Sequence, residues 1–242
     1  MTEMRPFQIR RIFACCLAFL AALASLPGTA LAEPVLLPAP YAQLEQELDA
    51  RIDFETLPRR AEPGINLVAP IRDGGAWLGE RLAGQRVSGR VHDGLHGTPA
   101  LPLSVRAGAP GASLSLAYHR GFGSTALFPL GPVGFPALKA RGEGAVAVLF
   151  DHGQRAMGLR IHSDYPTPLG QARPQGTITL TFYRADGHVI GQIRRRLSGG
   201  VNELGFRRAG DIADIAAFTL TNDDPGGIAL DDILYQTAPM AF

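Results

Sequence analysis

Two neighbouring carboxylates near the end of the chain are the residues best placed to do chemistry. Asp231 and Asp232 stand inside the apolar run Ile228–Tyr235, which has the length and composition of a β-strand. Neighbouring residues of a strand face opposite sides, so we expect one of the two carboxylates to point toward the core. An ionised group there needs a cation, backbone N–H donors or an arginine partner, because an unpaired buried charge costs several kcal/mol.

A second acidic segment lies near the start of the predicted fold. Residues 52–55 alternate apolar and acidic side chains, so Asp53 and Glu55 share one face. If the first and last strands pair, Glu55 can meet the closing carboxylates, and a bridging Ca²⁺ relieves their repulsion. We expect a structural calcium ion with Glu55 and Asp232 as ligands and with Asp53 and Asp231 as reserves. The alternative is that one Asp caps a bulge or pairs with arginine while the other is solvated.

Trp77 is the only tryptophan, and it stands in the glycine-rich segment 73–79. An aromatic ring in such a segment can stack on the apolar C–H face of a sugar. The competing interpretation is a ring that plugs the end of a β-sandwich core. Trp77 is therefore our candidate ligand-binding residue, with both interpretations open.

Other groups of residues that could bind metal or catalyse hydrolysis give weaker sequence signals. His92 and His96 have a spacing that suits zinc on a helix, but glycines and Pro99 predict a loop, and no third ligand is evident. There is no Gly-x-Ser-x-Gly elbow for a serine hydrolase. A glycosidase could use several carboxylates of the mature chain, namely Glu143, Asp151, Asp164 and Asp186. The sequence brings no two of these together, so no catalytic residue is assigned.

Short strands must position these residues. From residue 52 onward glycine and proline interrupt the chain every few residues, and the runs between them alternate apolar and polar side chains. The clearest predicted strands are 113–119, 145–151, 157–162, 177–184, 188–194, 201–207, 215–221 and 228–235. This pattern predicts an all-β fold, an antiparallel two-sheet β-sandwich of jelly-roll-like type. Residues 43–51 are expected to form a short N-terminal helix, and residues 72–112 and 163–176 are expected to be long loops.

The first 32 residues resemble a cleaved signal peptide. Three arginines precede the apolar run 12–26, and the small residues Ala30 and Ala32 mark a cleavage site. The run is shorter than the roughly 20 residues of a membrane-spanning helix, which disfavours a permanent anchor. We expect a secreted or periplasmic protein without a membrane span after cleavage, made of an extended lead-in and helix over 33–51 and one domain over 52–242.

Charge and cysteine content limit the classes of binding partner and ligand that the mature protein can have. Cleavage removes three of the 23 basic residues and one of the 22 acidic residues, which leaves 20 against 21. This near-neutral balance argues against nucleic acid or an anionic membrane as the partner. Both cysteines lie in the signal peptide, so the mature domain has no disulfide and no thiolate ligand.

The two ends of the predicted domain resemble a known family. Phe54-Glu55 and the closing Ile-x-Leu-Asp-Asp-Ile-x-Tyr at 228–235 resemble jelly-roll carbohydrate-binding modules of the galactose-binding-like type. The resemblance implies that Glu55 and an Asp of the closing pair bind a structural Ca²⁺. Further segments are similar to β-sandwich modules of exported bacterial proteins of the PEP-CTERM type: 148–151, 179–187, 218–222 and 226–232. The sorting tail of that type is absent before Phe242, so we expect release.

These observations predict an exported, non-enzymatic module that binds a glycan or a cell-surface component and carries structural calcium. The alternatives are a glycoside hydrolase-like carbohydrate-active enzyme on the same scaffold, and a purely structural extracellular protein. A convergent pair of acids in a groove would favour the enzyme. A shallow face with an aromatic side chain would favour the binding module.

Overall fold

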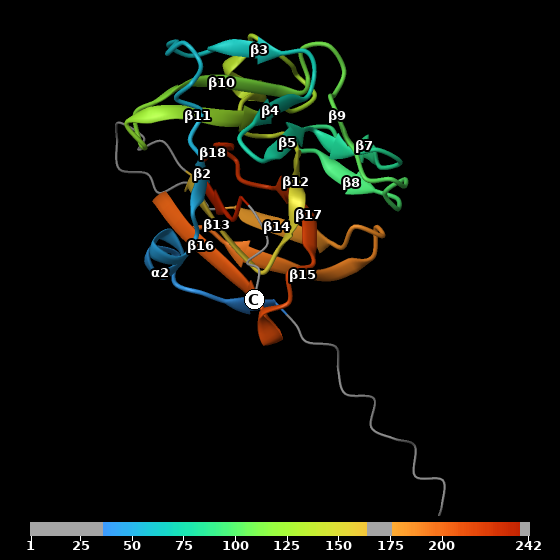
Figure 1. Ribbon diagram of the computed structural model, residues 1–242. Coiled ribbons are helices and arrows are strands. Elements are labelled where there is room, and N and C mark those ends of the chain that lie inside the picture. The colour runs from blue at the N-terminus through green and yellow to red at the C-terminus, as the bar shows by residue number, and fades with distance from the viewer. Residues whose placement is uncertain (1–35, 164–175, 238–242) are drawn as a thin grey trace, which may run out of the picture. The chain divides into compact units, whose positions relative to one another are not determined.

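Antiparallel strands make up nearly all of the regular structure in the computed structural model, which describes residues 36–163 and 176–237 (Figure 1). The chain divides after Glu33, and every described residue belongs to the second unit, Pro34–Phe242. The predicted signal peptide and nearly all of the predicted loop 163–176 lie outside the described residues. No helix of the described part is long and apolar enough to cross a membrane.

One sheet has eight strands. Its order is β1 (Leu36–Pro38), β16 (Gly200–Arg208), β13 (Ala156–Ser163), β18 (Ile228–Tyr235), β11 (Ser124–Pro129), β10 (Leu114–His119) and β3 (Ile65–Leu67). The eighth strand, β2 (Ala50–Ile52), pairs with β18. The first strand of the predicted sandwich therefore does lie beside the last, as the calcium hypothesis requires.

The other sheet has six strands, in the order β15 (Val189–Arg196), β14 (Thr177–Tyr183), β17 (Ile215–Asn222), β12 (Val146–Gln154), β5 (Ala76–Gly79) and β4 (Ile71–Asp73). Two small ladders join β6 (Arg81–Leu82) to β9 (Val105–Arg106) and β7 (Arg86–Ser88) to β8 (Gly94–His96). The helical segments among the described residues are α2 (Tyr41–Glu47), η2 (Leu138–Ala140) and η3 (Ala209–Asp211). From β15 to β18, successive strands alternate between the two large sheets.

The core lies between the two large sheets. Ile161 and Leu230 of the eight-stranded sheet belong to one buried cluster with Phe182 and Phe218 of the six-stranded sheet. All eight strands predicted from alternation are present, within a few residues at each end. The all-β two-sheet sandwich is thus confirmed, and the alternation was a reliable guide because one face of each strand is buried.

The hairpin of β14 and β15 shows how local sequence builds this sheet. Ile178, Leu180 and Phe182 are fully buried, while the residues between them face outward. In the connecting turn Gly187 has a φ of 79°, and Asp186 accepts the N–H of His188 at 3.0 Å. Glycine reaches this left-handed conformation without steric cost, which explains the predicted turn.

A bulge in β18 corrects the prediction that one closing carboxylate points into the core. Along β13 and β18 the pairing runs from Gly158 opposite Leu234 to Arg160 opposite Asp231, so β18 supplies one extra residue. Asp232 has a φ of 48° at this point. Leu230 and Ile233 both remain in the core, so neither Asp belongs to the core face.

Three other predictions need correction. The predicted helix 43–51 is shorter, because residues 50–52 form β2 after α2 ends. The lead-in before residue 52 also supplies β1, which pairs with β16, so the sandwich includes it. The predicted loop 72–112 contains most of six short strands, β4 to β9, which are too short for periodicity to reveal.

Candidate functional site

Trp77 faces away from the core of the sandwich. Its neighbours on β5, Ala76 and Leu78, are fully buried in the core, whereas Trp77 is 39% exposed. Because successive side chains of a strand alternate, burial of Ala76 and Leu78 forces the indole to the outer face of the six-stranded sheet. The structure therefore excludes Trp77 as a plug of the core.

Tyr235 holds the turn of the hairpin that carries Trp77. The Tyr235 hydroxyl accepts the N–H of Gly75 at 2.7 Å, and its ring stacks on Phe150. A Cβ at Gly74 would lie 2.3 Å from the Tyr235 hydroxyl oxygen. The two glycines at this turn are thus required for the close approach that holds β5 in place.

Cross-strand neighbours extend the outer surface on both sides of the indole. Trp77 lies opposite Arg72 of β4 and opposite Leu149 of β12, and Leu149 lies opposite Ala217 of β17. Beyond Leu149 the pairing of β12 with β17 is interrupted until Gln154. Residues 150–153 therefore leave the ladder with β17, while Phe150 still pairs with Ala76 of β5.

These residues enclose a groove. A hollow of about 420 Å³ is lined by Trp77, Pro102, Leu103, Leu149, Phe150, Asp151, His152, Gly153, Ala185 and Ala216. An adjoining hollow of about 360 Å³ shares three of these residues and adds Arg184, Asp186, Ala213 and Asp214. We call the two together the Trp77 groove. It combines one aromatic face with a few polar groups, which is the composition of many small-molecule sites.

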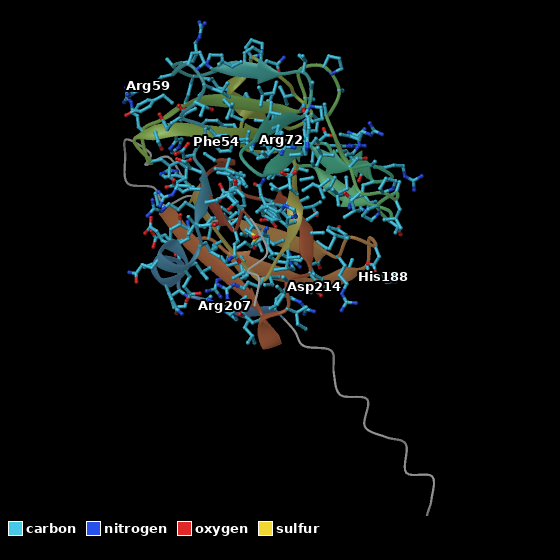
Figure 2. The ribbon with its side chains drawn as sticks, viewed as in Figure 1. Phe54, Arg59, Arg72, His188, Arg207 and Asp214 are labelled. Carbon is cyan, nitrogen blue, oxygen red and sulfur yellow. The ribbon has the colours of Figure 1, made fainter. Side chains whose placement is uncertain are left out.

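Ion pairs border the groove at both ends. Near Trp77, Arg72 donates from Nη2 to Asp151 Oδ2 at 2.6 Å, and its guanidinium carbon lies 5.7 Å from the centre of the indole. At the far end Arg184 donates to Asp214 at 3.1 Å. Figure 2 labels Arg72 and Asp214 among the side chains. Paired arginine and carboxylate groups offer both donors and acceptors to the hydroxyl groups of a ligand.

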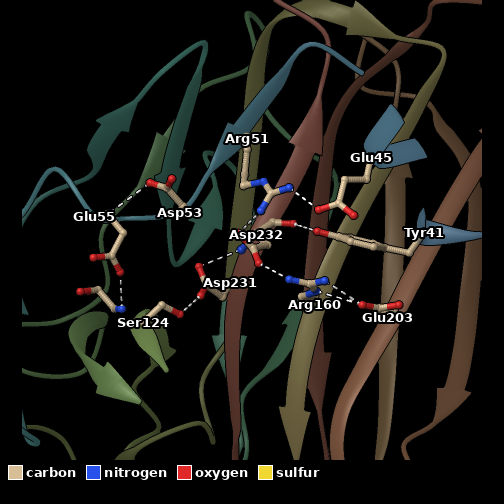
Figure 3. Close-up of polar contacts among 11 residues, drawn as sticks. Tyr41, Glu45, Arg51, Asp53, Glu55, Ser124, Arg160, Glu203, Asp231 and Asp232 are labelled. Atoms are coloured by element: carbon tan, nitrogen blue, oxygen red, sulfur yellow. Dashed lines mark hydrogen bonds and ion pairs between the residues drawn. The ribbon is translucent and has the colours of Figure 1, made fainter. Parts of the chain in front are cut away.

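Two of the four predicted metal-binding carboxylates, Glu55 and Asp231, contact the start of β11, and Asp53 lies beside Glu55 (Figure 3). Glu55 accepts the N–H of Thr125 at 2.6 Å, and Asp231 accepts the hydroxyl of the adjacent Ser124. Asp53 accepts the N–H of Glu55 at 3.1 Å. Burial, with smaller contributions from Asp232 and Asp53, raises the pKa of Asp231 to about 7.

The side chain of Asp232, the fourth carboxylate, is bound by two arginines instead. One of its oxygens accepts from Arg51 at 3.2 Å and the other from Arg160 at 2.6 Å. Asp231 meanwhile accepts the N–H of Asp232 at 2.8 Å, which caps the bulge. These contacts match two elements of the alternative to a calcium site, because Asp232 pairs with arginine and Asp231 caps the bulge. The solvated carboxylate of that alternative is absent, since Asp231 is buried.

The predicted calcium site is only partly matched by this geometry. Asp53, Glu55 and Asp231 supply oxygen atoms from converging segments, but Asp232 is committed to two guanidinium groups. Within residues 36–163 and 176–237, no three His, Cys, Asp or Glu side chains are grouped as metal ligands. The calcium ion therefore stays a prediction, with Asp232 the poorest of its four candidate ligands.

The histidines considered for zinc have other surroundings. His92 Nε2 lies 2.8 Å from the carbonyl oxygen of Asp224, and His96 lies on β8. Nothing local in the sequence marks Arg72 as the cross-strand neighbour of Trp77. Asp151 could be named from the sequence only as one of several candidate acids. Asp164, another of those acids, lies outside the described residues.

Comparisons with known proteins identify no family. No protein-family model matches the sequence, and no curated protein matches it. Among solved structures, the chain is similar to the enzymatically active domain of tailspike protein 4 from bacteriophage CBA120, with 13% identity and a TM-score of 0.31. The match covers 51% of this chain and 17% of that chain, and a similarity this low carries no argument about function. The resemblance to galactose-binding-like and PEP-CTERM-type modules thus depends on its sequence motifs alone.

Proposed function

We propose that the protein is an exported glycan-binding β-sandwich whose ligand occupies the Trp77 groove. The observation that carries the proposal is the outward-facing indole of Trp77 beside the Arg72–Asp151 ion pair. A pyranose ring has an apolar C–H face and a polar rim of hydroxyl groups. The indole fits the first and the ion pair fits the second.

The surroundings of Trp77 support a preformed site. The ring stands on a strand rather than a mobile loop, and the turn before it is held by the hydrogen bond between Gly75 and Tyr235. A ligand therefore meets a platform that does not have to be ordered on binding, which lowers the entropic cost of association. Export follows from the predicted signal peptide and is part of the same proposal.

Affinity gel electrophoresis against a panel of soluble polysaccharides tests the proposal, followed by calorimetry on any ligand found. Trp77→Ala should weaken binding about tenfold or more, whereas Trp77→Phe should retain part of the affinity. Leu138→Ala removes another exposed apolar side chain outside the groove and serves as the matched control. Unchanged affinity in Trp77→Ala, or no retardation by any polysaccharide, would exclude the groove as a glycan site.

A further inference from the structure

The Trp77 groove continues past the indole toward the turn between β14 and β15. Its two hollows, of about 420 Å³ and about 360 Å³, have Gly153, Ala185 and Ala216 in common among the described residues. A side chain of one carbon or none is the smallest that a protein can place at such a junction. The connection between the two hollows is therefore open to a ligand that extends from one into the other.

An interruption in the sheet makes room for the second hollow. Between Leu149 and Gln154, β12 supplies several residues opposite the single residue Ala216 of β17. This part of β12 must therefore arch away from β17. A Cβ at Gly153 would lie 2.2 Å from the carbonyl oxygen of Ala213, so the end of the arch returns closely to the chain that leads into β17. Glycine is required there, and the arch is fixed at both ends.

Hydrogen bonds also fix the far wall of the second hollow. Asp214 accepts from Arg184 at 3.1 Å and from the buried Arg208 at 2.6 and 2.9 Å. The N–H of Arg184 donates to the carbonyl of His188 at 2.9 Å, and Asp186 accepts the N–H of His188 at 3.0 Å. The turn that carries Ala185 is thus preformed, as the Trp77 platform is, and a ligand does not have to order it.

The arginine and aspartate charges along the groove cancel. Three residues of each type line the groove or pair with its lining residues: Arg72, Arg184, Arg208, Asp151, Asp186 and Asp214. Each arginine donates to one of these aspartates, so an anionic sugar would have to displace a carboxylate that is already bound. Hydroxyl groups can donate to the carboxylates and accept from the guanidinium groups without breaking the ion pairs. The charge pattern therefore favours an uncharged ligand.

We infer that the Trp77 groove binds an uncharged glycan chain of at least two sugar units, an inference that rests on the proposed glycan ligand. One unit stacks on Trp77, and the next lies over Ala185 and Ala216, with its hydroxyl groups toward the Arg184–Asp214 ion pair. The second unit is tethered to the first and loses little further translational freedom, so it should raise the affinity about tenfold or more. Ala185 and Ala216 thus determine the length of chain that the groove accepts.

The experiment measures binding of single sugars and of their oligosaccharides by calorimetry, with ligand-observed NMR for the weakest. The uncharged series come from cellulose, xylan, mannan and starch, and oligomers of alginate and polygalacturonate are the anionic series. Measurements at about pH 8 keep imidazole side chains from adding positive charge. In the wild type, an uncharged oligosaccharide should bind about tenfold or more tightly than its single sugar.

Two variants locate the second unit. Ala185 is exposed in its turn, so Ala185→Leu should fold normally and fill the junction between the hollows. It should remove the gain in affinity with chain length and leave binding of the single sugar unchanged. Ala42→Leu adds the same side chain at an exposed alanine of α2, outside the groove, and should change no affinity. Circular dichroism checks folding, and the chain-length series in the wild type tests the inference without any variant.

The possible outcomes separate this inference from the proposed function. A gain with chain length that is lost in Ala185→Leu and kept in Ala42→Leu supports the inference. Equal affinity for single sugars and oligosaccharides, a gain that Ala185→Leu retains, or tighter binding of the anionic series overturns it. In those cases glycan binding still stands if Trp77→Ala weakens it. No binding by any series, or binding that Trp77→Ala leaves unchanged, overturns both proposals.

Discussion

Asp214 should be among the most sensitive surface-accessible positions of the domain, because it neutralises a buried arginine. Arg208 Nε donates to Asp214 Oδ1 at 2.6 Å, and Arg208 Nη2 donates to Asp214 Oδ2 at 2.9 Å. The Arg208 side chain is 1% exposed and the Asp214 side chain 21% exposed. Asp214→Asn removes the negative charge and leaves the guanidinium in its buried position.

The size of the effect follows from this geometry. Removing one partner of a buried ion pair costs about 3–5 kcal/mol, because the other charge loses its compensation. Asp214 is partly exposed, so we expect the lower end, about 3 kcal/mol. For a domain of this size, that corresponds to a fall in Tm of about 6–12 °C.

Urea unfolding followed by tryptophan fluorescence measures the free energy of unfolding, and calorimetry measures Tm. Glu203→Gln is the matched control, because its ion pair with Arg160 is more exposed and should contribute about 1 kcal/mol or less. Adding Arg208→Leu to Asp214→Asn should restore part of the stability, since it removes the buried charge. A loss in Asp214→Asn no larger than in Glu203→Gln would refute the reasoning.

Two further predictions concern stability. Ca²⁺ should raise the Tm of the mature protein and EDTA should lower it if Asp53, Glu55 and Asp231 hold the ion, and identical melting curves would remove the calcium site. Burial, followed by the effect of His162, lowers the pKa of His119 to about 4. The unfolded chain then binds a proton that the folded protein does not, so stability should fall as the pH drops from about 6.5 to 4. His119→Gln should flatten this dependence in a Tm–pH series, and an unchanged slope would contradict it.

The strands and the core could be predicted because they follow from local patterns. Burial of one face of each strand requires apolar residues at every second position, as Ile178, Leu180 and Phe182 show. Pairing of the first and last strands was a correct hypothesis about Ile52 and its partner Ile233. The short strands between residues 71 and 106 were missed because two to four residues carry no readable period.

Tertiary structure decided how the functional groups are arranged. Asp231 is off the core face because it follows Leu230, and the extra residue in β18 moves Asp232 off that face as well. A change of register of this kind is invisible to an alternation rule. The outward direction of Trp77 depended on which face of β5 is buried. Sequence alone determined which side chains could do chemistry and that the fold is built from antiparallel strands. Only the packed chain placed Arg72 and Asp151 beside Trp77, because pairing between distant segments sets such distances and local residue preferences do not.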